Sequence, residues 1–128
     1  MANILVVDDR PFDRAYMVEL LSIQKHSVFE ASNGVEALAW LRSKHSDLVI
    51  IRIMLPATDG LEFVRRLRAE PSTAAVPIII VTPEHDNPEA TTLAQIRGIA
   101  NIVIEPSTPG KILRIVESAL RTASHTTP

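Results

Sequence analysis

The sequence predicts an α/β domain in which helices cover both faces of an open parallel sheet. Three observations lead to this fold class. Five short apolar runs rich in branched side chains recur along the 128 residues. Each run is followed by a segment whose apolar residues have helical spacing. The runs are uninterrupted by polar residues, which is typical of strands buried on both faces.

The strands are predicted by the apolar runs Ile4–Val7, Val28–Ala31, Leu48–Ile51, Pro77–Val81 and Ile102–Ile104. The helices are predicted to begin at Pro11 and then to span Val35–Ser43, Leu61–Ala69, Pro88–Arg97 and Pro109–Arg121. Proline favours the first position of a helix, which supports the start at Pro11. Asn33-Gly34 is a predicted turn, Pro56 and Asp59-Gly60 break the chain, and Gly98 ends the fourth helix.

Apolar spacing also predicts which side of each helix faces the sheet. The inward positions are Ala15, Val18 and Leu21, then Leu38 and Leu41, then Phe63, Val64 and Leu67, and finally Ile112, Val116 and Leu120. The four histidines show no metal-ligand spacing and are expected at the surface. Asp59 precedes a predicted helix and is expected to act as its N-cap.

Composition excludes several classes of protein. The absence of cysteine excludes disulfides, thiolate zinc sites and cysteine nucleophiles. A net charge of −2 and 4% aromatic residues argue against nucleic-acid binding. The apolar runs are too short to span a membrane, and no basic segment marks a secretory signal, so a cytoplasmic location is expected. One domain is expected over residues 1–121, with 122–128 as a disordered tail or the start of a linker.

Candidate functional residues follow the predicted strands. In an open α/β sheet, functional side chains gather where the strands end at their carboxyl edge. Asp8 and Asp9 follow the first strand, Arg52 the third, Thr82 the fourth and Glu105 the fifth. Three carboxylates and one guanidinium are therefore expected together at one edge of the sheet.

Six segments in order carry a resemblance to a known family. They are Ile4–Asp9, Asn33–Leu38, Asp47–Ile51, Met54-Leu55-Pro56 with Asp59-Gly60, Pro77–Thr82 and Glu105-Pro106. Over Asn3–Leu120 the chain resembles the receiver domain of response regulators (CheY-like). The resemblance implies a flavodoxin-like fold with strand order 2-1-3-4-5 and five helices. It also implies a role in a two-component, or phosphorelay, signalling system and no activity as an enzyme.

In this family a histidine kinase transfers a phosphoryl group to an aspartate at the end of the third strand. The resemblance further implies an acidic pair that holds a divalent cation, here Asp8 and Asp9, and a hydroxyl that contacts the phosphoryl group, here Thr82. Two positions depart from the pattern. Arg52 stands at the phosphoacceptor position, and Glu105 stands where the family has a phosphate-contacting lysine.

These departures predict a degenerate phosphorylation site. A guanidinium has no acceptor lone pair and cannot attack phosphorus. We expect Arg52 to pair with Asp8 or Asp9 and to reach Glu105 across the intervening strand. Mg²⁺ binding is then expected to be weak or absent, with any residual binding at Asp8 and Asp9, and no other cofactor is expected. An Arg52 side chain extended into solvent remains the alternative. Ile102 takes the place of the family's aromatic switch residue.

The predicted function is that of a pseudo-receiver, a phosphorylation-independent protein-interaction module. Its partners would be a histidine kinase or an effector in bacterial signalling. The resemblance also implies a possible homodimer through helix 4, strand 5 and helix 5, here the predicted segments Pro88–Arg97, Ile102–Ile104 and Pro109–Arg121. The alternative is a working phosphorelay receiver that uses Asp8, Asp9 or Asp59 as acceptor. A nucleotide-binding enzyme on the same fold is disfavoured because no glycine-rich loop opens the first helix.

Overall fold

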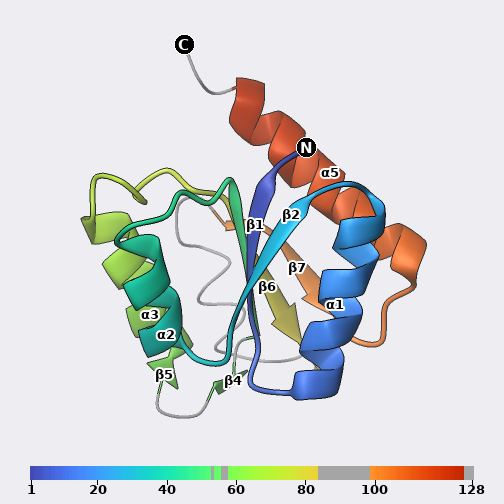
Figure 1. The fold of residues 1–128 in the computed structure, drawn as a ribbon, viewed down its shortest axis with the longest axis horizontal. Helices are drawn as coiled ribbons and strands as arrows, with labels where there is room; N and C mark the ends of the chain where they lie inside the picture. Colours follow the sequence, from blue (N-terminus) through green and yellow to red (C-terminus); the bar gives the residue numbers. More distant parts are fainter. Residues whose placement is uncertain (53, 56–57, 84–98, 126–128) are drawn as a thin grey trace.

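A computed structural model describes residues 1–52, 54–55, 58–83 and 99–125. Its centre is a parallel sheet of five strands (Figure 1). The strands are β1 (Asn3–Val7), β2 (Ser27–Ala31), β3 (Leu48–Arg52), β6 (Ile78–Thr82) and β7 (Ile99–Ile104). Their order across the sheet is β2-β1-β3-β6-β7. The predicted fold class and the strand order 2-1-3-4-5 are therefore confirmed.

Two layers of helices enclose the sheet. In Figure 1, α1 (Pro11–Ile23) and α5 (Pro109–His125) lie on one side, and α2 (Gly34–Leu41) and α3 (Gly60–Ala69) lie on the other. These are the four helices of the described residues, and the helix predicted for Pro88–Arg97 falls outside them. The structure adds a short antiparallel hairpin, β4 (Met54–Leu55) and β5 (Thr58–Asp59), which the sequence did not predict.

The apolar core has two halves because side chains alternate between the faces of a strand. Leu5, Val7, Val49 and Ile51 belong to the half under α2 and α3. The alternate residues of the same strands belong to the half under α1 and α5, and they are Ile4, Val6, Leu48 and Ile50. All eight side chains are at most 2% exposed, as expected for central strands of a parallel sheet.

Most predicted helix faces are correct, with one exception on α1. Phe63, Val64, Leu67, Ile112 and Val116 are buried. Ala15, however, is exposed and Val18 is only half-buried, and Met17 joins the correctly predicted Leu21 in the buried stripe of α1. Two residues turn a helix by roughly 200°, so a face centred on Met17 and Leu21 directs Ala15 away from the sheet.

The prediction that all histidines lie at the surface is wrong for His26. Its side chain is 5% exposed. Nδ1 accepts the Ala2 N–H at 3.1 Å, and Nε2 lies 3.1 Å from Glu117 Oε1. The Nδ1 bond requires the tautomer in which Nε2 carries the proton. His26 therefore links the start of the sheet to α5.

Two boundaries differ from the predictions for local reasons. The predicted turn at Asn33-Gly34 is the start of α2, since Asn33 Oδ1 caps the helix by accepting the Glu36 N–H at 2.8 Å. At the other end of the chain, α5 continues past Arg121 to His125. No proline or glycine interrupts Thr122–His125, so the helix has no signal to stop at Arg121.

The core half under α2 and α3 depends on Phe63, which is 1% exposed. We predict that Phe63→Ala lowers the free energy of unfolding by about 3–5 kcal/mol, because it removes buried area and leaves a cavity. Phe12→Ala is the matched control, since Phe12 is 90% exposed, and it should change stability by about 0.5 kcal/mol or less. Urea unfolding measures both. Equal effects of the two substitutions would contradict the packing described here.

Candidate functional site

Three charged residues extend one apolar row of the sheet. Val6, Ile50 and Val103 belong to the core half under α1 and α5. Asp8, Arg52 and Glu105 each follow one of these residues by two positions. Since alternate residues of a strand share a face, the three charged side chains continue the row on that face. The alternation brings them together at the carboxyl edge of the sheet.

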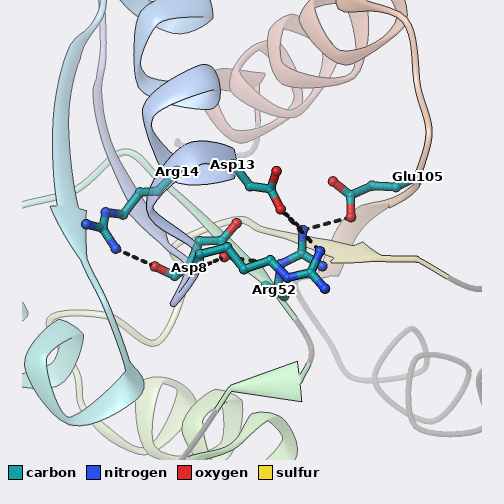
Figure 2. Close-up of polar contacts among 6 residues, drawn as sticks. Asp8, Asp13, Arg14, Arg52 and Glu105 are labelled. Atoms are coloured by element: carbon teal, nitrogen blue, oxygen red, sulfur yellow. Dashed lines mark hydrogen bonds and ion pairs between the residues drawn. The ribbon is translucent and has the colours of Figure 1, made fainter.

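Arg52 is the centre of this group. Its side chain is 4% exposed. Nε donates to Asp8 Oδ1 at 3.1 Å, and Nη2 donates to Glu105 Oε1 at 2.8 Å and to Asp13 Oδ2 at 3.3 Å. Figure 2 shows the guanidinium between these carboxylates. The predicted pairs of Arg52 with Asp8 and Glu105 are present, and an Arg52 side chain extended into solvent is not.

Asp8 connects the Arg52 cluster, which consists of Arg52 with Asp8, Asp13 and Glu105, to the start of α1. Its Oδ1 also accepts the Arg10 N–H at 2.9 Å, a local bond that turns the chain from β1 into the helix. The Asp8 carbonyl oxygen accepts from Arg14 Nη1 at 2.8 Å, and Arg14 Nε in turn pairs with Glu30 of β2 at 2.9 Å. The backbone and the carboxylate of Asp8 are thus both held by arginines.

Asp13 is the member of the site that sequence reasoning missed. It lies in the first turn of α1, which begins only a few residues beyond β1. An acidic residue there stands at the carboxyl edge of the sheet, within reach of anything at the end of β3. This position in the sequence is the feature that could have identified Asp13 as a site residue. Acidic residues are common in first turns, where they stabilise the helix dipole, so the signal is not specific.

The other predicted site residues lie apart from the ion pairs of Arg52. Asp9 is half-buried, and its carboxylate makes no hydrogen bond or ion pair with any residue in the described ranges. Thr82 is 1% exposed, and its carbonyl oxygen accepts the Glu105 N–H at 2.8 Å. Ile102 is partly buried and packs against the core half under α2 and α3. Asp59 ends β5 directly before α3, and its role as the N-cap of that helix stays a prediction.

Burial and charge act in opposite directions on the two central groups. Burial raises the pKa of Asp8 above its ordinary value, although the Arg10 N–H and the charge of Arg52 each act to lower it. Burial would lower the pKa of Arg52, but the charges of Asp8, Glu105 and Asp13 outweigh it and raise that pKa. Arg52 is therefore permanently cationic, and its charge favours the ionised form of Asp8.

A cavity of about 310 Å³ adjoins the cluster between α1, α5 and the sheet. Arg52, Asp13 and Glu105 contribute to its wall, and the remaining wall is largely apolar, with Val6, Met17, Ile50, Val81, Val103 and Ile112 among its residues. The Arg52 cluster therefore forms the polar wall of this cavity, and side chains of the apolar core form the opposite wall. Within the described residues, no group of three or more His, Cys, Asp or Glu side chains is arranged to hold a metal ion.

Comparison with known proteins identifies the family. The model of the response regulator receiver domain matches residues 4–117. The chain belongs to the receiver domain family of response regulators. Receiver domains are signalling modules of two-component systems and interact with histidine kinases and effector proteins.

Individual relatives agree with this assignment. The receiver chain is 29% identical to Protein PilH of Pseudomonas aeruginosa over 120 residues, which cover 94% of the chain and 98% of PilH. It is 33% identical to the transcriptional regulatory protein ResD of Bacillus subtilis over 125 residues, but spans only 50% of ResD. The chemotaxis response regulator CheY4 of Vibrio cholerae superposes with a TM-score of 0.85 at 28% identity, covering 93% of this chain and 98% of CheY4.

The receiver fold contains no helix, within its described residues, that is long and apolar enough to cross a membrane.

The buried pair of Arg52 and Asp8 makes a prediction about pH. We predict that Arg52→Met lowers the free energy of unfolding by about 3 kcal/mol at neutral pH, because it leaves Asp8 buried without a countercharge. Loss of the guanidinium raises the pKa of Asp8 further. A carboxyl group whose pKa in the folded protein lies above its ordinary value of 3.8 destabilises the fold as the pH rises from the ordinary pKa to the folded-state pKa. The deficit of the variant should therefore shrink on acidification toward about pH 4.5.

Urea unfolding at both pH values measures this effect. Arg66→Met is the control, since Arg66 pairs with Glu62 through exposed side chains and should change stability by about 0.5 kcal/mol or less at either pH. A deficit for Arg52→Met that does not depend on pH, or one as small as that of the control, would contradict the buried ion pair.

Proposed function

We propose that this receiver domain takes no part in phosphoryl transfer and acts as a phosphorylation-independent protein-interaction module in two-component signalling. The observation that carries the proposal is Arg52, buried at the end of β3 and paired with Asp8 and Glu105. A receiver of the usual kind needs a nucleophilic carboxylate at this position. A guanidinium carries five donors and no acceptor, so it has no electron pair to offer to phosphorus.

The charges around Arg52 also oppose the other requirements of phosphoryl transfer. Transferring phosphoryl groups need cations that stabilise the developing negative charge. Here Glu105 lies 2.8 Å from Arg52 and places a carboxylate on the side where a cation is needed. The positive charge of Arg52 is already shared among three carboxylates, so little of it remains for an incoming phosphoryl group.

The same residues do not fit a divalent cation. Asp8 Oδ1 accepts from both the Arg10 N–H and Arg52 Nε, so its lone pairs are directed at fixed donors. A metal ion bound by Asp8 would also stand close to a guanidinium that cannot lose its charge. We propose that Mg²⁺ binds weakly or not at all and that the tethered guanidinium takes its electrostatic role.

The proposed mechanism is a fixed conformation. The ion pairs of Arg52 join the end of β1 through Asp8, the first turn of α1 through Asp13, and the segment after β7 through Glu105. That segment leads directly into α5, whose exposed side carries Lys111, Arg114 and Arg121. We propose that this basic side of α5 contacts an acidic surface of a histidine kinase, an effector or a second receiver domain.

A working receiver with another acceptor is the second candidate, and one observation favours it. Asp9 is half-buried and has no hydrogen bond or ion pair in the described part of the chain, so none of the described residues occupies its carboxylate. Asp8 is less suited because two donors hold its Oδ1. Asp59 remains a third possible acceptor.

Incubation with acetyl phosphate and Mg²⁺, followed by intact-mass measurement, separates these candidates. We predict no phosphoryl adduct on the natural chain. The positive control is the double variant Arg52→Asp with Glu105→Lys, which supplies both a carboxylate nucleophile and a cation and should gain one adduct. An adduct on the natural chain that maps to Asp8, Asp9 or Asp59 would refute the proposal and support the second candidate.

A further inference from the structure

A groove lies at the edge of the sheet opposite to Arg52, beside the segments that lead into β3 and β6. It consists of two adjoining cavities of about 360 and 210 Å³. Both are lined by Leu41, Arg42, Ser72 and Thr73, so they form one continuous hollow between the end of α2 and the turn after α3. Sites for small organic ligands have volumes of about 300–1,000 Å³, and this groove falls in that range.

The rim of the groove is cationic, although the chain carries a net charge of −2. Arg42 and Lys44 are exposed lining residues, and neither forms an ion pair with another residue of the described ranges. Arg66 lines the same groove and shares its charge with Glu62, 3.1 Å away. Glu70 supplies a negative charge at the far side of the larger cavity. Two cations are thus available to an anionic ligand.

Donors already occupy one carbonyl group in the last turn of α3 and two in the segment that follows it. Thr73 Oγ1 donates to the Leu67 carbonyl oxygen at 2.6 Å. Arg68 donates from Nη1 to the Thr73 carbonyl at 3.1 Å and from Nη2 to the Val76 carbonyl at 2.7 Å. The Thr73 bond satisfies one of the carbonyl groups that the end of a helix leaves without a partner. These three bonds also fix the turn that forms one wall of the groove.

We propose that this groove binds a small organic phosphate. The planar fork of Arg42 and the ammonium of Lys44 suit the oxygens of a phosphomonoester. The hydroxyls of Ser43 and Ser72 stand on the same rim. Leu38, Leu41 and Leu67 line the larger cavity and would contact the apolar body of the ligand. The groove is separate from the Arg52 cluster, so this inference does not depend on the proposed function.

The test uses adenosine monophosphate as the probe, with adenosine and inorganic phosphate as its two halves. Each is titrated into the full chain labelled with ¹⁵N, and amide shifts are followed. The nucleotide should shift signals of residues 38–46 and 66–73 and bind more tightly than either half. The double variant Arg42→Gln with Lys44→Gln should weaken nucleotide binding at least about tenfold. The matched control, Lys25→Gln with Arg65→Gln, removes the same charge from exposed residues that do not line the groove and should leave the affinity unchanged.

Three results would overturn the proposal. The nucleotide could leave the signals of the groove unshifted, or bind the Arg42 and Lys44 variant as tightly as the natural chain. Alternatively, inorganic phosphate alone could bind as tightly as the nucleotide, which would reduce the groove to a site for a simple ion. Unfolding midpoints of both double variants verify that a loss of binding is not a loss of fold.

Discussion

A guanidinium buried at the end of a central strand must be neutralised by its surroundings, and the rest of the site depends on this requirement. Removing a charged group from water costs several kcal/mol unless close countercharges and hydrogen bonds replace the hydration. Arg52 is 4% exposed, and carboxylates of three separate segments surround it. The three carboxylates therefore have a structural role, because the positions of Asp8, Asp13 and Glu105 are each coupled to the charge of Arg52.

This arrangement has a consequence for signalling. In a receiver of the usual kind the charge of the site changes when a metal ion or a phosphoryl group arrives. Arg52 is attached to the chain and its pKa is raised by its partners, so its positive charge is permanent. The proposed role as an interaction module follows from that permanence, because β1, α1 and the segment leading to α5 stay joined without any external ligand.

Much of the fold and part of the site could be predicted from the sequence. The apolar runs predicted all five strands of the parallel sheet. The alternation of side chains between the two faces of a strand explains why Asp8, Arg52 and Glu105 share a face. Asp13 was not predicted as a site residue because an acidic side chain in the first turn is common in helices. Ala15 was misplaced because small residues fit either side of α1, whereas Met17 and Leu21 set its orientation. The hairpin of β4 and β5 has strands of only two residues, too short to produce a periodic signal.

The central claim is that the Arg52 guanidinium is held by carboxylates in place of a divalent ion. The ¹H–¹⁵N signal of Arg52 Nε tests it most directly, since a bonded and buried N–H exchanges slowly with water. The account predicts one resolved, slowly exchanging Arg52 signal that is unchanged by a large excess of Mg²⁺. A rapidly exchanging Arg52 signal, together with Mg²⁺-dependent shifts at Asp8 and Asp9, would contradict it.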